Sequence, residues 1–186
     1  MIHIRRERPA DVAAREALLD AAFGADRLLK TSQRLRDGRL PAPGLSFVAT
    51  EAGRLVGTVR LWEISAGGRP ALLLGPLAVA PEARNRGIGS ALMRHALDHA
   101  RQAGHTGVLL VGDAPYYGRF GFSSGETAGL RLPGPCEAER LLARELVPGA
   151  LAGLHGAVRP TGRLARAPRR PAAVQGGFDV RLPRAA

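Results

Sequence analysis

Two arginines and two glycines meet in the stretch RNRGIG, from Arg84 to Gly89, directly before an amphipathic segment. The first N–H groups of a helix have no partner within the helix and carry partial positive charge, so a helix start attracts anions. Glycines at 87 and 89 have no Cβ that would keep a phosphate from the backbone. Arg84 and Arg86 add positive charge. From spacing alone, the stretch predicts either a phosphate site or a tight turn that serves strand-to-helix packing.

Other spacings argue against several kinds of nucleotide and metal chemistry. No Lys-Ser or Lys-Thr pair follows the glycines as in a Walker loop, and Leu92 replaces the third glycine of a dinucleotide fingerprint. His95 and His99 are four residues apart, a spacing that can bind a metal, but no third ligand is near in sequence and Cys136 has no ligand spacing with them. We therefore expect no metal site, solvated histidines and no hydrolase chemistry.

The strand that precedes the turn carries an unusual proline. The run PALLLGPLAVAP, from Pro70 to Pro81, is apolar enough to be buried on both faces, yet Gly75-Pro76 interrupts it. A proline cannot donate to a neighbouring strand, so we expect a bulge or splay at Pro76. The next segment predicts a helix from about Ile88 to Ala103, followed by a parallel strand in GVLLVG.

The remaining elements complete a mixed α/β sheet in one domain. IHIRRE predicts a first strand, and a helix that ends at Gly24 follows it, with apolar positions at Val12, Leu18, Leu19, Ala22 and Phe23. Residues 27–36 predict a second helix, and LSFVATE and RLVGTVRLWEIS predict a hairpin. After the short helical turn in DAPYYGRFGF we expect a strand in ETAGLRLP, a helix in ERLLARELV and a weakly defined element in GALAGLHGAV.

The net charge of +11 is unevenly distributed. Residues 159–186 hold seven arginines and one acid, Asp179, and are rich in Pro and Ala, so we expect a domain over residues 1–158 and a disordered basic tail over 159–186. A single cysteine, an N-terminus without an apolar leader and the lack of any long apolar window predict a cytoplasmic protein without membrane contact.

The motifs together resemble the GNAT superfamily of N-acetyltransferases. Its acyl-CoA signature is a strand followed by (Q/R)xxGx(G/A) at the start of a helix, and Arg84, Gly87 and Gly89 in LAVAPEARNRGIGSALM match it. The order of elements from Ile2 to about Arg159 is similar as well. LLLGPLAV, LLVGDAPYYGRFGF and AAFGADRLLKTSQRLRDG resemble the YhbS-type branch of predicted acetyltransferases. The resemblance implies the GNAT fold, a single domain with a central mixed sheet splayed at the fourth strand.

The resemblance also implies acetyl-CoA as cosubstrate and places its contacts. Backbone N–H groups of the turn would hold the pyrophosphate, the strand past Pro76 would pair with the pantetheine arm like an added strand, and the Leu77 N–H would polarise the thioester carbonyl. The implied cofactor-binding residues are Leu77, Ala78, Val79, Arg84, Asn85, Arg86, Gly87, Ile88, Gly89 and Ser90.

Tyr117 is the general acid that the resemblance implies. Members of the family carry a tyrosine four residues before the glycine of a YxxxGF ending, and Tyr117 in YGRFGF occupies that place. A tyrosine with an ordinary pKa of about 10 can protonate a thiolate with a pKa of about 8.5. Alternatively, Tyr116 and Tyr117 are core aromatics. The candidate general bases are Glu63 and Asp113, the latter also a candidate helix cap, and a water chain is a third route.

These features predict an acetyl-CoA-dependent N-acetyltransferase, an acyltransferase in which an amine attacks the bound thioester directly in a ternary complex. The alternatives are a nucleic-acid-binding protein that uses its arginine-rich tail, which we consider the weaker hypothesis, and a catalytically silent acyl-CoA sensor. In the family the region between the first strand and the hairpin, here residues 23–44, shapes the acceptor side. Its charges select no substrate class, so small-molecule and peptide amines both remain open. Homodimers are common in the family.

Overall fold

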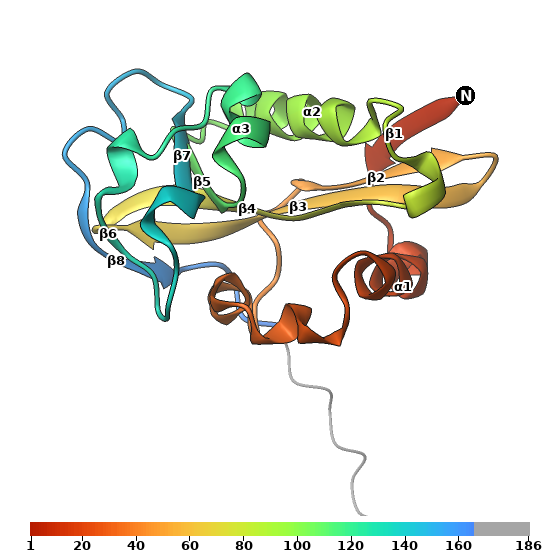
Figure 1. The fold of residues 1–186 in the computed structure, drawn as a ribbon, viewed down its shortest axis with the longest axis horizontal. Coiled ribbons are helices and arrows are strands. Elements are labelled where there is room, and N and C mark those ends of the chain that lie inside the picture. The colour runs from red at the N-terminus through yellow and green to blue at the C-terminus, as the bar shows by residue number, and fades with distance from the viewer. Residues whose placement is uncertain (166–186) are drawn as a thin grey trace, which may run out of the picture.

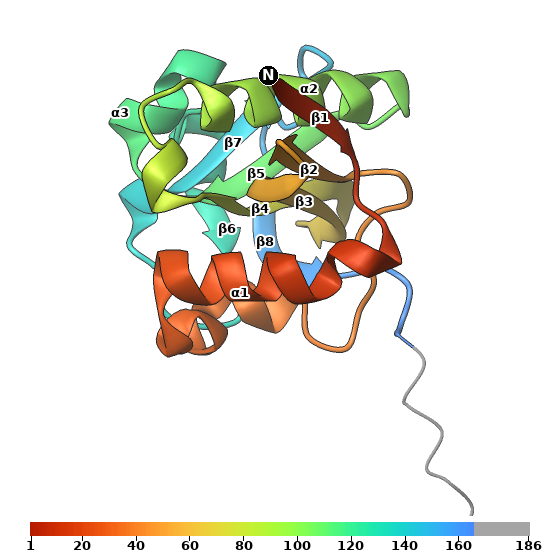
Figure 2. The ribbon, with the colours of Figure 1, turned by 90° about the vertical axis from the view of Figure 1, so that its right-hand side faces the viewer.

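The computed structural model describes residues 1–165, which form a mixed sheet with helices on both faces (Figure 1). Helices α2 (Ile88–Gln102) and α3 (Ala114–Tyr117) cover one face, and α1 (Val12–Phe23) covers the other. The view in Figure 2 shows the strands lying between α1 and α2. The strands are β1 (Ile2–Arg6), β2 (Ser46–Glu51), β3 (Arg54–Ala66), β4 (Arg69–Val79), β5 (Gly107–Val111), β6 (Gly129–Arg131), β7 (Leu141–Glu145) and β8 (His155–Pro160).

The sheet combines antiparallel pairs with a parallel pair at its centre, β4 and β5, and a second parallel pair, β6 and β8, off its main path. The strand order is β1-β2-β3-β4-β5-β7, and within this path only β4 and β5 are parallel. The long strand β3 pairs with two strands in addition to β4. Its first half pairs with β2, and Ile64–Ala66 pairs with β8. The predicted mixed α/β sheet, including the parallel pair that α2 connects, is confirmed.

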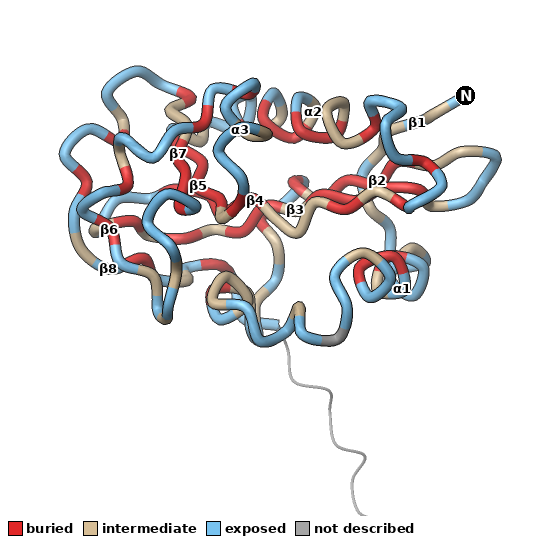
Figure 3. Tube along the Cα trace, in the orientation of Figure 1, coloured by how far each residue is buried: buried red, intermediate tan, exposed pale blue. Residues whose placement is uncertain are grey.

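Apolar side chains fill the space on each side of the sheet, and Figure 3 shows the buried residues concentrated along the strands and the inner side of α2. A side chain at Gly57 of β3 would prevent the close approach of α2, because a Cβ there would lie 2.9 Å from a methyl carbon of Leu92. The apolar stripe predicted for α2 is buried, and consists of Ile88, Leu92, Met93, Ala96, Leu97 and Ala100.

Helix α1 is only partly as predicted. Leu18 and Leu19 are buried, but Val12 and Phe23 are exposed. A charged residue, Arg15, is buried instead. Its guanidinium forms an ion pair with Glu7, which also binds Arg60 on β3. This polar network joins α1 to the sheet, so hydrophobic periodicity alone could not predict which face of the helix is buried.

Two predicted helices are wrong. Residues 27–36 form parts of two short 3-10 segments, Ala25–Leu29 and Thr31–Leu35, because Lys30 between them is extended. The stretch ERLLARELV contains strand β7, which pairs antiparallel with β5. Its consecutive apolar residues are split between the two faces of the sheet, with Leu142 in one core and Leu141 and Ala143 in the other. Tertiary pairing thus overrides the helical propensity of this stretch.

The chain remains ordered past the predicted domain boundary at residue 158. Arg159 and Pro160 belong to β8, and the following residues pair with residues 38–40 through an Arg39–Leu164 bridge. Residues 159–165 therefore pair with the described fold, which does not fit a disordered tail that begins at residue 159. Residues 166–186 lie outside the described part, so the disorder predicted for them stays a prediction. Residues 1–165 include no helix long and apolar enough to cross a membrane.

Candidate functional site

Strand β4 leaves its parallel neighbour halfway along its length. Only Leu72 and Leu73 pair with β5, whereas β4 continues to Val79. The departure coincides with the Gly75–Pro76 peptide bond, which is cis. The predicted splay at Pro76 is therefore present, and past this point β4 has an open edge on the side of β5.

Leu77 and Val79 direct their backbone polar groups toward that open edge. The Ala80 N–H donates to the Val56 carbonyl of β3 at 2.9 Å. Backbone groups of successive residues alternate between the two edges of a strand, so Ala78 also faces β3 while Leu77 and Val79 face away. These two residues can therefore pair with an extended ligand laid along the strand.

Helix α2 begins without a side-chain cap. Its N-cap residue is Gly87, with a φ of 78°, and Asn85 also has a positive φ, 60°. The first N–H group that donates along the helix is that of Ala91, which donates to the Gly87 carbonyl at 2.9 Å. Within residues 1–165 the N–H groups of residues 88–90 donate to no protein atom. Three backbone donors are thus available to an anion at the positive end of the helix.

One cavity of about 700 Å³ joins the open edge of β4 to the start of α2. It brings together most of the predicted cofactor residues, and α3 and the end of α1 close its sides. The predicted site residues that line it are Leu77, Ala78, Val79, Arg84, Asn85, Gly87, Ile88, Gly89, Ser90, Asp113 and Tyr117.

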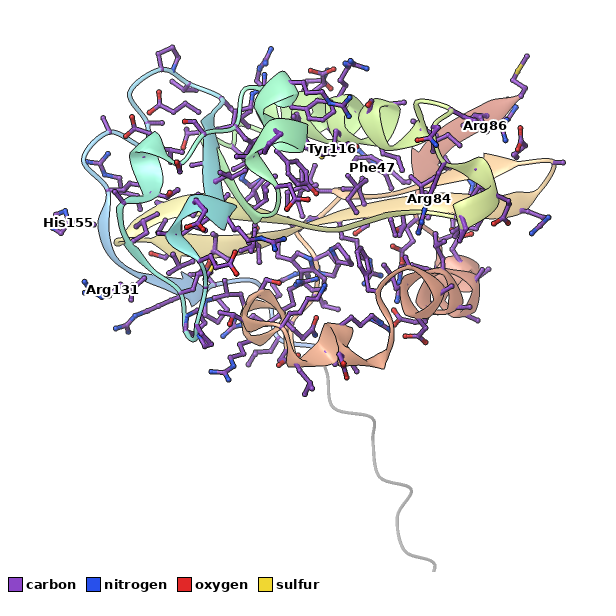
Figure 4. The ribbon with its side chains drawn as sticks, viewed as in Figure 1. Phe47, Arg84, Arg86, Tyr116, Arg131 and His155 are labelled. Carbon is purple, nitrogen blue, oxygen red and sulfur yellow. The ribbon has the colours of Figure 1, made fainter. Side chains whose placement is uncertain are left out.

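Arg86 is the one predicted cofactor residue that does not line this cavity. Its guanidinium makes two hydrogen bonds to the carboxylate of Glu51, at 2.8 and 2.6 Å. Figure 4 shows Arg86 near β1 and Arg84 apart from it. Glu51 holds the side chain of Arg86, so of this pair only Arg84 lines the cavity, where Arg119 is a further cation.

Tyr117 lies between this cavity and a second one, and it lines both. Its ring rests against Gly112, where a Cβ would lie only 2.2 Å from Cε2 of Tyr117. Burial is the main cause that raises the pKa of Tyr117 to about 12. The hydroxyl therefore keeps its proton at neutral pH, and it is a weaker acid than the tyrosine of ordinary pKa that the sequence predicted.

Tyr116 is placed differently from its neighbour. Its hydroxyl lies beside the start of α2, 3.0 Å from where a Cβ on Gly89 would be. The Arg119 guanidinium covers its ring at 4.3 Å, and the Tyr116 and Tyr117 rings meet edge to face at 4.9 Å. The Tyr116 ring also packs near Phe120 and the Tyr117 ring near Phe122. Both tyrosines are nevertheless half-buried and line the cavity, so they are not simply core aromatics.

The two candidate bases occupy different regions. Asp113 lines the first cavity with Tyr117, although its side chain is 75% exposed and lies 3.4 Å from Arg140. Glu63 lines neither this cavity nor the second one, because it lies on β3 opposite Leu72, where β4 and β5 are still paired. The expectation that Glu63 is a base is therefore not supported by its position.

Two predicted histidines are less exposed than expected. His95 and His99 are half-buried, and their rings pack on Phe47 with centroid distances of 4.7 and 5.0 Å. The desolvation that accompanies this packing lowers the pKa of His95. Among residues 1–165, no three His, Cys, Asp or Glu side chains are grouped as a metal site.

We expect Gly112→Ala to reduce turnover at least tenfold, because the new methyl group would occupy the place of the Tyr117 ring and move its hydroxyl. The same overlap should lower the free energy of unfolding by about 1–3 kcal/mol. Steady-state kinetics and urea denaturation measure the two effects. Gly118→Ala is the matched control, because no atom lies within 4 Å of a Cβ there and the φ of −55° suits alanine. Equal turnover of the two variants would contradict this role of Gly112.

A second cavity of about 130 Å³, which sequence reasoning missed, adjoins the first. The two share Phe23, Leu77 and Tyr117 in their linings. The segment of 3-10 turns forms one wall and contributes Arg27, Lys30, Ser32, Gln33 and Arg36. The sequence signal was the concentration of cations in residues 27–36, but a continuous helix would have placed Arg36 on the face opposite to Arg27 and Lys30.

Comparisons with known proteins agree with this geometry. Residues 13–122, more than half of the chain, match the family model described as the acetyltransferase (GNAT) family. The chain is 33% identical to the N-acetyltransferase YhbS of Escherichia coli (strain K12) over 159 residues, which cover 83% of this chain and 93% of that protein.

Solved structures show the same relationship. The crystal structure of Escherichia coli YhbS in complex with CoA has a TM-score of 0.74 and 30% identity, and the match covers 86% of this chain and 89% of that one. A GNAT family acetyltransferase from Brucella melitensis in complex with acetyl-CoA has a TM-score of 0.57 and 30% identity, over 78% of this chain and 97% of that one. The chain therefore belongs to the GNAT family of acetyltransferases.

Proposed function

We propose that this N-acetyltransferase transfers the acetyl group of acetyl-CoA directly to an amine within a ternary complex. The observation that carries the proposal is the first cavity, whose lining combines an uncapped helix start, an open strand edge and a protonated tyrosine. Relatives in the family were crystallised with CoA or acetyl-CoA. The chemistry of the lining fits the same ligand, since each part of the cavity suits a different part of acetyl-CoA.

The start of α2 binds the pyrophosphate in this proposal. The N–H groups of residues 88–90 donate to its oxygens, and Arg84 adds charge from the cavity wall. Gly89 allows a phosphate to approach the backbone closely, because it has no Cβ. A Cβ at this position would also be crowded, since it would lie 3.0 Å from Tyr116 Oη and 3.5 Å from Val79 Cγ2.

The open edge of β4 binds the pantetheine arm. Leu77 and Val79 offer backbone donors and acceptors to its amides, as a neighbouring strand would. The Leu77 N–H also donates to the thioester carbonyl, and this hydrogen bond strengthens as negative charge develops on the oxygen during attack. The splay at Pro76 is what makes these groups available.

The reaction then needs only an acid and a route for one proton. The lone pair of a neutral amine attacks the thioester carbon and forms the C–N bond, and collapse of the tetrahedral intermediate breaks the C–S bond. Tyr117 gives its proton to the departing thiolate. The proton that the nitrogen loses passes to water and restores the tyrosine, so the products are the amide and CoA with a free thiol. Asp113, which lines the same cavity and is exposed, connects this route to solvent.

Calorimetry with acetyl-CoA tests the proposal. We expect saturable binding, followed by release of free CoA when an accepted amine is added. No binding at millimolar acetyl-CoA would overturn the proposal. Binding without CoA release across a broad panel of amines would instead favour the acyl-CoA sensor. The nucleic-acid alternative depends on the seven arginines of residues 159–186, and the described residues add no specific observation in its favour.

A further inference from the structure

The second cavity lies where an acceptor would meet the acetyl group. Its lining includes Pro76 and Leu77 of β4 together with Tyr117, and the last two also line the cavity assigned to acetyl-CoA. Under the proposed function, an amine in this cavity adjoins both the backbone group that binds the thioester and the acid that protonates its sulfur. The cavity is much the smaller of the two, at about 130 Å³, and it therefore suits a small acceptor.

The charged side chains that line the second cavity are all cationic. Arg27, Lys30 and Arg36 line the cavity, and no Asp or Glu does. Arg27 is already neutralised, because Glu16 and Asp20 bind its guanidinium at 2.5 and 2.7 Å. Within residues 1–165, neither Lys30 nor Arg36 has a carboxylate within 4.0 Å, and the Lys30 ammonium lies over the ring of Phe23 at 4.9 Å.

Two hydrogen bonds fix the orientation of the Arg36 guanidinium, and its other N–H groups are available to a ligand. Its Nε donates to the Ser32 carbonyl at 3.0 Å, and Nη2 donates to Ser32 Oγ at 2.7 Å. A guanidinium has five N–H donors, so both N–H bonds of Nη1 and one of Nη2 lack an acceptor among the described residues. Burial lowers the pKa of Arg36 to about 10, since the charge is largely removed from water. Arg36 is half-buried, and a partly desolvated cation of this kind is stabilised by an anionic ligand.

We infer that the acceptor is a small amine that carries a carboxylate, such as a free amino acid, and that Arg36 binds this carboxylate in the second cavity. The inference rests on the proposed function and names the class of its acceptor. The free edge of the guanidinium, Nη1 and Nη2, matches the two oxygens of a carboxylate. A polyamine or another polycationic amine would instead be repelled by Lys30 and Arg36.

The same charges ease the loss of the acceptor's proton. A positive group near an ammonium disfavours its charged form and lowers its pKa. Once Arg36 holds the carboxylate, the remaining positive charge of Lys30 favours the neutral amine that attacks the thioester. An acceptor site of this kind works with an exposed carboxylate such as Asp113, or with water, as the final proton acceptor.

Matched pairs of acceptors test the inference with the full-length protein. Steady-state CoA release would be measured for a series of free amino acids and for the corresponding amino-acid amides, which differ only in the carboxylate. We expect kcat/KM to be about 10- to 100-fold higher for the acids, the size of a charge-assisted hydrogen bond. Equal or better turnover of the amides by the unaltered protein would overturn the inference.

Variants of Arg36 assign the effect to its guanidinium. Arg36→Gln should remove the preference by lowering kcat/KM for the acids much more than for the amides, and Arg36→Lys should retain part of the preference. Arg34→Gln is the matched control, because Arg34 is exposed, binds the Pro133 carbonyl and does not line the cavity. A loss of the same size for acids and amides in Arg36→Gln would contradict the assignment.

Calorimetry with acetyl-CoA on the same preparations distinguishes a failure of the proposed function from a failure of the carboxylate inference. If the unaltered protein does not bind acetyl-CoA, the proposed function itself is contradicted. Acetyl-CoA binding combined with neither turnover nor calorimetric binding of any amino acid contradicts the carboxylate inference alone. An acid preference that Arg36→Gln abolishes, with acetyl-CoA affinity preserved, supports both.

Discussion

Gly89→Glu should weaken acetyl-CoA binding by at least about 100-fold. The substitution places a carboxylate beside the uncapped N–H groups of α2, where it competes for them as an intramolecular anion and repels a phosphate, and like charges in such a site cost several kcal/mol. The new side chain also meets Tyr116, whose hydroxyl lies 3.0 Å from the Cβ position. Calorimetry with acetyl-CoA measures the loss.

Gly89→Gln is the matched control for this experiment, because it adds nearly the same volume without charge. It should weaken binding less than the glutamate does, and the ratio of the two affinities isolates the electrostatic part. Thermal unfolding of both variants checks that each is folded. If Gly89→Glu binds acetyl-CoA as tightly as the unaltered protein, the start of α2 is not the pyrophosphate site.

The elements around this helix start could be predicted because local patterns determine them. The burial stripe of α2 has a period of 3.6 residues, and a proline in an apolar strand leaves few structures besides a splay. For the helix and the splay the information lies within about twenty consecutive residues, so a single sequence suffices. The assignment of Tyr117 depended instead on the YxxxGF pattern of the family that the chain resembles, and its role as the acid stays a prediction.

The wrong predictions concern residues whose structure depends on distant partners. ERLLARELV has a helical pattern, but the free edge of β5 makes a strand of Leu141–Glu145. Glu63 was a candidate base by its residue type, and its position beside the closed part of the sheet appears only when the strand register is known. Arg86 could not be distinguished from Arg84, because Glu51, its partner, is 35 residues away in sequence.

The acceptor site is the clearest case of a feature that depends on residues distant in sequence. Arg36 became a candidate only when the two 3-10 segments brought it to the wall that Leu77 and Tyr117 share. Ser32 fixes its guanidinium through contacts four residues apart, which the sequence does contain. What the sequence does not contain is that Glu16 and Asp20 bind Arg27, whereas no carboxylate of residues 1–165, the adjacent Asp37 included, forms an ion pair with Arg36.

Tyr117→Phe should lower kcat by about 10²- to 10⁴-fold, the usual contribution of a positioned general acid. The ring remains, so its packing against Gly112 and the shape of both cavities are preserved. Acetyl-CoA affinity should therefore stay close to that of the unaltered protein. Pre-steady-state measurement of CoA release separates slow chemistry from slow product release, and an unchanged rate would remove Tyr117 from the mechanism.

The pH dependence of kcat distinguishes an acid role of Tyr117 from a merely structural one. Burial raises its pKa to about 12, so the hydroxyl remains protonated well into the alkaline range and the unaltered protein should show no decline from loss of this proton below about pH 10. In Tyr117→Phe the thiolate must take its proton from water or leave unprotonated.

Tyr116→Phe is the comparison for Tyr117→Phe. The Tyr116 hydroxyl lies beside Gly89, so its loss should appear in KM for acetyl-CoA rather than in kcat. If Tyr116→Phe lowers kcat as much as Tyr117→Phe does, the assignment of the acid to one of the two rings is wrong.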